Sequence, residues 1–177
     1  MRVAIVGAFC TGKTTLVNDL SGAVANSFTV SDECRPILDR LGNVDWSMEE
    51  IRSYLIVRQL YVEARGFADG QLIVIDGGII NNLAHDVIHL KHSASRERII
   101  HSLGHTRYDL VLWCDPQGVQ LVDDGQRNTN ESVRWDLHYE VGATCNRLGY
   151  EPRLIQGDRL QRLSTALVEV GKLGDVT

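Results

Sequence analysis

The sequence predicts an α/β fold in which a five-stranded parallel sheet lies between two layers of helices. Five short apolar segments alternate along the chain with longer segments that have helical periodicity. The strand segments are almost entirely apolar, as expected for strands that helices cover on both faces. The chain has 177 residues, of which 44% are hydrophobic and 23% charged, and this composition suits one soluble domain with its own core.

The five predicted strands are short runs rich in aliphatic residues. In chain order they are residues 3–7, 28–31, 72–76, 110–116 and 152–155. The first run leads directly into a glycine-rich turn at Gly7, and the third ends in the carboxylate of Asp76. Asp115 and Pro116 stop the fourth run. We therefore expect polar groups and glycine at the carboxyl ends of several strands.

The predicted helices have apolar residues three or four positions apart and recognisable ends. In chain order they are residues 13–23, 33–41, 47–67, 79–90, 93–103, 131–148 and 160–170. Ser47 and Glu50 form a capping box at the start of the long third helix, whose apolar stripe includes Leu55 and Tyr61. Gly149 is typical of the residue that follows the last turn of a helix.

Residues 7–14 read G-x-x-x-x-G-K-T, the phosphate-binding P-loop motif, between the first predicted strand and the first helix. The glycines allow a bend whose N–H groups face phosphate oxygens, and the helix that opens at Gly12 adds its positive dipole end. Lys13 supplies a charge for the β- and γ-phosphates, and the Thr14 hydroxyl can coordinate Mg²⁺. ATP and Mg²⁺ are therefore the expected cofactors. The residues expected to bind ATP in this segment are Gly7, Ala8, Phe9, Cys10, Thr11, Gly12, Lys13, Thr14 and Thr15.

Three carboxylates fall at predicted strand ends, where parallel sheets bind their ligands: Asp32, Asp76 and Asp115. We expect Asp76 to hold Mg²⁺ together with Thr14, directly or through water, because carboxylates beside a P-loop are the usual metal partners. The alternative for Asp76 is a simple cap of the turn or helix that follows its strand.

An acceptor hydroxyl benefits from a carboxylate that takes up its proton. Asp32 and Glu33 are both candidates, and their chemistry alone does not choose between them. Arg35 is a candidate for gripping the acceptor or the transferring phosphate with its planar guanidinium. The alternative is that Glu33 stabilises a helix dipole and forms an ion pair with a neighbour.

Together these motifs make the chain resemble the P-loop kinase domain of bacterial ribosylnicotinamide kinases and, more loosely, thymidylate and deoxynucleoside kinases. Beyond the P-loop, the matching segments are Asp32-Glu33-Cys34-Arg35, Arg58-Gln59 with Glu63, Val74-Ile75-Asp76, and the lid motif Asp123-Asp124-Gly125-Gln126-Arg127. The resemblance covers nearly the whole chain. One departure is Gly77-Gly78 after Asp76, where thymidylate kinases carry an arginine, and it weakens the expectation of a monophosphate acceptor.

The resemblance implies a P-loop NTPase three-layer sandwich, with a single kinase domain over residues 1–177 and a lid at about residues 117–135. It implies that Glu33 is the base and that Gln59 lies at the acceptor. The catalytic residues are then Lys13, Glu33, Asp76 and Arg127.

In such a lid, Arg127 and Arg134 close over the phosphates and stabilise the charge of the transition state. The alternative for both is an ordinary surface arginine in a solvated loop. The resemblance also implies that Gly157 and Asp158 wrap the adenine of ATP.

Aromatic and histidine side chains offer further candidates. Trp46 and Tyr54 are the aromatic pair expected on the substrate side, where they would stack on a base, with core packing as the alternative. His85 and His89 share one helix face and His92 follows, but H-E-x-x-H is absent, so surface or substrate-side histidines are favoured over a zinc site.

The four cysteines are widely spaced and form no C-x-x-C pair, so we expect reduced thiols and a cytoplasmic protein. Cys10 lies in the phosphate loop, where a redox switch is the alternative to a passive filler. No run of about 18 apolar residues predicts a membrane span. The first apolar stretch leads straight into the P-loop, so no signal peptide is expected.

The predicted function is an ATP-dependent kinase that transfers the γ-phosphate to a hydroxyl of a small nucleoside or nucleotide-like acceptor. One alternative acceptor is a hydroxymethylated base in DNA, which the net charge of −5 disfavours. Another alternative is a nucleotide-dependent regulatory ATPase. A GTP switch is disfavoured because the sequence has no Asn-Lys-x-Asp motif. The sequence does not indicate an oligomeric state.

Overall fold

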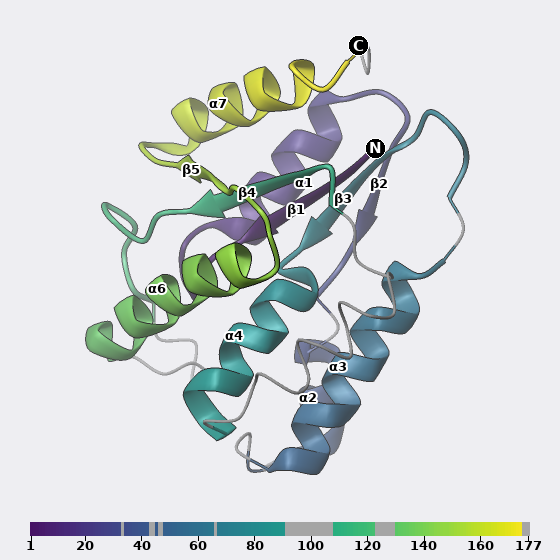
Figure 1. Ribbon diagram of the computed structural model, residues 1–177. Coiled ribbons are helices and arrows are strands. Elements are labelled where there is room, and N and C mark those ends of the chain that lie inside the picture. Colours follow the sequence, from purple (N-terminus) through teal and green to yellow (C-terminus); the bar gives the residue numbers. More distant parts are fainter. Residues whose placement is uncertain are drawn as a thin grey trace.

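The computed structural model describes residues 1–32, 34–42, 45, 48–65, 67–90, 108–122 and 130–174. One sheet has the strand order β2-β3-β1-β4-β5, and every neighbouring pair runs parallel (Figure 1). The strands are β1 (Arg2–Val6), β2 (Ser27–Val30), β3 (Leu72–Asp76), β4 (Leu110–Cys114) and β5 (Arg153–Ile155). The predicted five-stranded parallel sheet is confirmed, and each strand overlaps its predicted segment.

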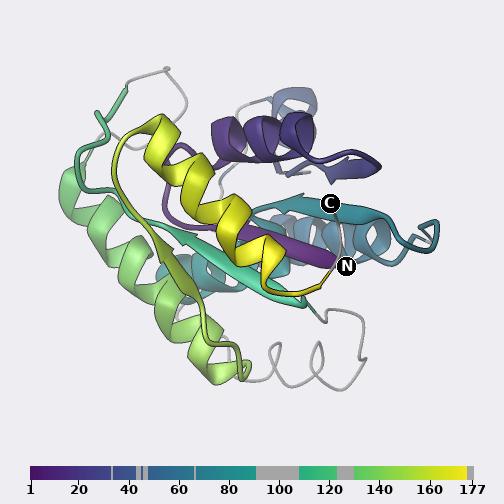
Figure 2. The ribbon, with the colours of Figure 1, turned by 90° about the horizontal axis from the view of Figure 1, so that it is seen from above.

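Helices cover both faces of this sheet (Figure 2). On one face lie α1 (Lys13–Ala23) and α7 (Arg159–Gly171), and on the other lie α3 (Glu49–Glu63), α4 (Gly78–Leu90) and α6 (Glu131–Arg147). α2 (Cys34–Leu41) follows β2. In the described part of the chain, no helix combines the length and the apolar character that crossing a membrane requires.

The central strand β1 shows why the sheet needs two layers. Val3 and Ile5 pack with Leu16 of α1, whereas Ala4 and Val6 belong to the core on the opposite face. These four β1 side chains have no exposed surface. Successive residues of a strand point to opposite faces, so an unbroken apolar run requires a cover on each side.

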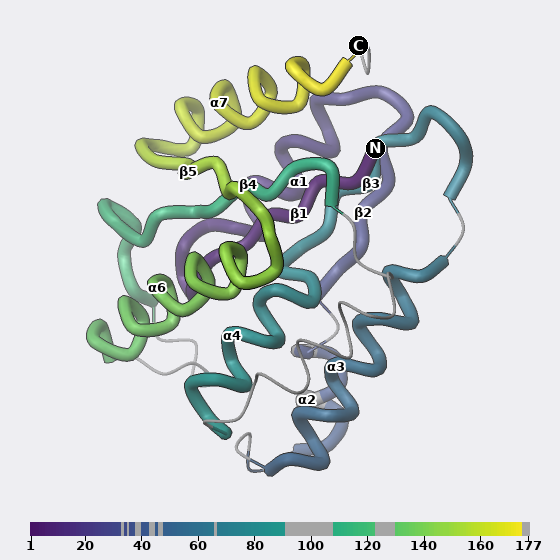
Figure 3. Tube along the Cα trace, in the orientation of Figure 1, coloured from purple at the N-terminus to yellow at the C-terminus, as the bar shows by residue number. Residues whose placement is uncertain are grey.

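The pairing register brings three strand ends to one edge of the sheet. Ile5 of β1 is opposite Asp76 of β3 and Leu112 of β4. The chain leaving β1 therefore passes between the ends of its two neighbours before it enters α1, a path that Figure 3 traces. This edge holds the candidate site.

The helix predictions hold with several changes. α3 spans Glu49–Glu63 and is shorter than predicted, and both the proposed cap Ser47 and the predicted helix at 93–103 lie outside the described residues. Tyr61 does not join the apolar stripe and is 60% exposed. A simple apolar periodicity does not reveal the buried face of α3, because this face mixes aliphatic and polar residues. Its members are Arg52, Leu55, Ile56, Gln59, Val62 and Glu63.

Candidate active site

The chain between β1 and α1 has the backbone conformation that the two motif glycines permit. Gly7 has φ of 147°, and a Cβ atom there would lie 2.8 Å from the Cys114 carbonyl oxygen. Gly12 has φ of 78° and is the N-cap residue of α1. Both conformations disfavour a side chain, so the motif glycines are required by the shape of the loop.

Lys13 folds back onto the loop that precedes it. Its Nζ donates a hydrogen bond of 2.6 Å to the Ala8 carbonyl, which also accepts from the Thr11 hydroxyl at 2.8 Å. The ammonium therefore lies at the loop itself, at the N-terminus of α1. Positive charge from the ammonium and from the helix dipole meets here, a combination that suits the binding of an anion.

Thr14 and Asp76, the predicted metal pair, are in direct contact. The Thr14 hydroxyl donates to Asp76 Oδ2 at 2.6 Å, and Asp76 is only 6% exposed. Burial raises the pKa of Asp76, the Lys13 ammonium and the Thr14 hydrogen bond oppose that shift, and the Asp32 carboxylate adds to it. A hydroxyl and a carboxylate are hard oxygen ligands and fit Mg²⁺, which takes its other ligands from water and phosphate.

The other two strand-end carboxylates have local partners. Asp32 Oδ1 accepts from the Cys34 N–H at 2.9 Å. Asp115 accepts from the Gln117 N–H at 2.8 Å and from Gln156 Nε2 at 2.6 Å. Burial alone would raise the pKa of Asp115, but these hydrogen bonds and the nearby charges of His138 and Arg162 together lower it. Asp115 thus stabilises the turns beside the site.

Arg162 of α7 connects three segments of the site, and sequence reasoning missed it. Its guanidinium donates to the carbonyls of Thr11, Asp115 and Gly157 at 2.7–2.8 Å, and the residue is 5% exposed. A trans peptide directs its C=O and the next N–H in opposite directions, so this contact turns the Gly12 N–H away from Arg162. Arg162 therefore helps to set the shape of the phosphate loop.

This arrangement leads to a first prediction. Arg162→Lys should lower the free energy of unfolding by about 2–3 kcal/mol and weaken Mg-ATP binding, because a single ammonium cannot reach three carbonyls. Denaturant titration and calorimetric binding would measure both. Arg153→Lys is the matched control, since the Arg153 side chain is 54% exposed and forms its ion pair with Glu169 at the surface, so both quantities should stay close to wild type. Equal effects of the two substitutions would contradict the prediction.

A cavity of about 270 Å³ opens beside the phosphate loop. It is lined by the start of α1, the segment after β4 and the turn before α7: Thr11, Gly12, Thr15, Leu16, Asp19, Gly118, Val119, Gln120, Gly157, Asp158, Arg159 and Arg162. At its lining, Arg159 forms two hydrogen bonds of 2.7 Å with the Asp19 carboxylate. Gly157 and Asp158 therefore lie next to the P-loop, on the wall of the same cavity as Thr11 and Gly12. This position is compatible with their predicted contact with adenine. Asp158 also caps α7 by accepting from the Gln161 N–H.

Arg134 occupies a different place from the one its predicted lid role requires. It is 1% exposed, and its Nη2 donates to the carbonyls of Pro116 and Val119 at 2.6 and 2.8 Å. A guanidinium held in this way supports the segment that lines the cavity and is not poised to swing over a phosphate. The other lid arginine, Arg127, lies outside the described residues.

The predicted acceptor residues are brought together only in part. Glu33, Trp46 and the side chain of Arg35 lie outside what the structure describes. Tyr54 is on α3 and is 53% exposed. Gln59 has no exposed surface, and its Nε2 donates to Glu63 Oε1 at 2.8 Å. Gln59 is therefore an interior residue, because α3 turns it into the protein and not toward a cleft.

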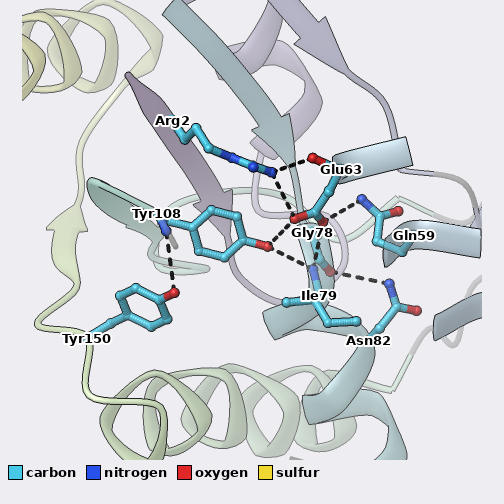
Figure 4. A network of polar contacts seen from close by, with 8 residues as sticks. All are labelled: Arg2, Gln59, Glu63, Gly78, Ile79, Asn82, Tyr108 and Tyr150. Carbon is cyan, nitrogen blue, oxygen red and sulfur yellow. Dashed lines mark hydrogen bonds and ion pairs between the residues drawn. The ribbon is translucent and has the colours of Figure 1, made fainter. Parts of the chain in front are cut away.

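The partner of Gln59, Glu63, is the centre of a buried polar network (Figure 4). Glu63 accepts from the Ile79 N–H at 3.1 Å and from the Tyr108 hydroxyl at 2.7 Å, and Arg2 Nη2 lies 3.8 Å from Oε2. Ile79 is in the first turn of α4, so the carboxylate satisfies a backbone donor that the helix itself cannot. The network thus fixes the turn that follows Asp76.

The Glu63 network predicts a pH dependence of stability. Burial raises the pKa of Glu63, despite the opposing hydrogen bonds from Gln59 and Tyr108. The stability that Glu63 contributes to the folded protein is therefore fully present below the ordinary glutamate pKa. It is lost as the pH rises through the raised pKa of the folded state. The glutamine of Glu63→Gln cannot ionise, so the free energy of unfolding should fall less steeply with pH. Within that window the two slopes should differ by up to about 1.4 kcal/mol per pH unit. Urea unfolding of the wild type and the variant from about pH 4 to 8 would measure the two slopes. A difference in free energy of unfolding that stays the same across this range would contradict the prediction.

The histidines do not form a metal site among the described residues. The rings of His85 and His89 are stacked with centroids 5.7 Å apart, and His92 lies outside the described part of the chain. Burial lowers the pKa of His85 well below its usual range, and the nearby Arg52 charge adds to the shift. In the described ranges no group of three or more His, Cys, Asp or Glu side chains could hold a metal.

Comparison with known proteins places this geometry in a family. A family model described as an AAA domain matches residues 2–162. The crystal structure of a NadR protein in complex with NR has a TM-score of 0.80 and 22% sequence identity, over 97% of this chain and 51% of that chain. The chain thus spans about half the length of that protein. No curated protein matches the sequence.

Two kinases of similar length share the fold. Thymidylate kinase from Ehrlichia chaffeensis has a TM-score of 0.68 and 15% identity, over 98% of this chain and 97% of that one. Deoxyadenosine kinase from M. mycoides has a TM-score of 0.66 and 11% identity, over 98% of this chain and 100% of that one. These findings confirm the predicted resemblance at the level of the fold. The chain belongs to the AAA domain family and has the fold of P-loop nucleoside and nucleotide kinases.

Proposed function

We propose that this protein is an ATP-dependent kinase that transfers the γ-phosphate to a hydroxyl of a small nucleoside or nucleotide-like acceptor. The observation that carries the proposal is the contact of Thr14 with Asp76 beside Lys13, at the sheet edge where the P-loop lies. Phosphoryl transfer depends mainly on positioning and charge neutralisation, and these three residues would supply both.

The donor side is supported by the cavity next to the loop. ATP would place its base in this cavity, near Gly157 and Asp158, and its phosphates on the loop N–H groups and Lys13. Thr14 and Asp76 would hold Mg²⁺, which would neutralise charge on the β- and γ-phosphates. A NadR protein with this fold was crystallised with NAD and AMP-PNP, which supports an adenine nucleotide as donor.

The acceptor side is proposed from sequence and from the relatives. Asp32 or Glu33 would take up the proton of the acceptor hydroxyl, and Arg127 would close over the transferring group. The Asp32 carboxylate is close enough to Asp76 to add to the rise of its pKa, which supports Asp32 as a candidate for this role. The relatives include a NadR protein in complex with NR and a thymidylate kinase, which supports a small nucleoside or nucleotide as acceptor.

An ADP-release assay across several acceptor classes would test the proposal. The panel contains ribosylnicotinamide, the common nucleosides, their monophosphates and DNA with hydroxymethylated bases. We expect one of the small acceptors to raise ADP release well above the rate with ATP alone. Stimulation by DNA alone would favour the DNA-base alternative, and turnover that no acceptor changes would favour a regulatory ATPase. Either result would overturn the proposal.

A further inference from the structure

Asn81, in the first turns of α4, binds the first glycine of the phosphate loop with both of its polar atoms. Its Nδ2 donates to the Gly7 carbonyl at 2.8 Å, and its Oδ1 accepts from the Gly7 N–H at 3.1 Å. The two residues are 74 positions apart in the chain, and Asn81 is 8% exposed. A buried side-chain amide paired with both backbone groups of one residue leaves that residue little freedom to move.

The Gly7 backbone determines where the next peptide lies. The carbonyl of the following residue, Ala8, accepts the hydrogen bonds of the Lys13 ammonium and the Thr11 hydroxyl. Gly7 has φ of 147°, and a glycine has many other conformations open to it, so contacts from outside the loop can select this one and give it support. Asn81 gives that support, and its hydrogen bonds therefore act on the position of the Lys13 ammonium through Ala8.

The same helix continues directly from the carboxylate of the metal pair. Gly77 follows Asp76, donates from its N–H to the Ile5 carbonyl at 2.8 Å and accepts from the Asn81 N–H at 3.3 Å. A Cβ atom on Gly77 would lie 3.4 Å from Asn81 Cβ, so the turn packs closely on Asn81. Asn81 thus contacts both the loop that carries Lys13 and the turn that carries Asp76.

We infer that Asn81 is a positioning residue that holds the phosphate loop in register with Asp76. The inference deepens the proposed function, because it concerns how the loop receives the β- and γ-phosphates of the donor. Asn81 does not touch the reacting atoms. Its loss should weaken binding of the phosphates beyond the first one and slow transfer, while the cavity continues to bind the rest of the nucleotide.

Asn82 provides a matched control on the same helix. It is also a buried asparagine, 3% exposed, and its side chain bonds to the Gly78 carbonyl at 3.2 Å and accepts from Cys34 Sγ at 3.1 Å. Neither contact involves the phosphate loop. Substitution of Asn82 therefore removes a buried amide from α4 without touching Gly7.

The experiment compares Asn81→Ala, Asn81→Asp and Asn82→Ala in the full chain. Calorimetry measures the Kd of ADP with Mg²⁺ and of AMP, and thermal unfolding measures Tm. Both alanine variants should lower Tm. Only the Asn81 variants should raise the Kd of ADP, by about tenfold, with the Kd of AMP changed less than about twofold. Asn81→Asp should be at least as severe as Asn81→Ala, since it sets a carboxylate oxygen against the Gly7 carbonyl.

A ratio of the ADP and AMP affinities that stays at the wild-type value in both Asn81 variants would overturn the inference. A shift of this ratio in Asn82→Ala as large as that in the Asn81 variants would also overturn it. Because the result is read from binding, it is separable from the proposed reaction. A wild-type chain that binds ADP but phosphorylates no acceptor would overturn the proposed function alone. A wild-type chain that binds neither nucleotide would overturn both.

Discussion

Lys13→Met should reduce phosphoryl transfer at least about 1,000-fold without unfolding the protein, a loss of about 4 kcal/mol of transition-state stabilisation. Methionine has a similar length but no charge, so it cannot meet the negative charge that develops on the γ-phosphate. The ammonium bonds to the Ala8 carbonyl of its own loop, so its removal leaves the core intact. ADP release in the presence of an accepted substrate would measure the effect.

Lys172→Met is the control for this substitution. Lys172 follows α7, its side chain is 62% exposed, and its ion pair with Glu169 is at the surface. We expect wild-type kcat and Tm for this variant. A Lys13→Met protein whose kcat stays within tenfold of wild type would remove Lys13 from the mechanism.

Asp76→Asn should have the second largest effect, lowering kcat by about 1,000-fold and abolishing its dependence on Mg²⁺ concentration. The amide keeps the volume of the carboxylate but loses the charge that would hold the metal with Thr14. Burial raises the pKa of Asp76, so the ionised form opposes folding at neutral pH. The variant should therefore keep or raise Tm while it loses activity.

Asp115→Asn is the matched control for Asp76→Asn. Asp115 follows β4, which is separated from β3 by β1, and is about as buried as Asp76, at 5% exposed, but its oxygens are bound by Gln117 and Gln156. Its pKa is lowered, so loss of its charge should reduce stability. Activity per folded molecule should change far less than in Asp76→Asn. If both variants kept the kcat of the wild type, the metal pair would be wrongly assigned.

The parts of this molecule that the sequence predicts are those with local signals. Strands and helices follow from the spacing of apolar residues, and the P-loop follows from eight consecutive residues. Asp76 could be paired with Thr14 because the ends of parallel strands meet at one edge of a sheet. The first two signals lie within continuous stretches of sequence, and the third follows from a general rule of parallel sheets although Thr14 and Asp76 are 62 residues apart.

The unpredicted parts depend on contacts between distant segments. Arg162 bonds to Thr11 across 151 residues, and Asn81 bonds to Gly7 across 74. Nothing near either residue in the sequence marks its partner. A helical periodicity also does not tell which way a long polar side chain turns, so Arg134 was expected over the phosphates although it is buried under the segment after β4.

The separation in sequence between Arg162 and the loop that it supports has a consequence for biosynthesis. The P-loop is synthesised before the guanidinium that fixes the Thr11 peptide, because Arg162 lies 151 residues further along the chain. Ile155, Ala166 and Val170 likewise complete the core on the face of α1. A nascent chain that has not reached α7 therefore carries the phosphate-loop motif without the contacts that complete its shape.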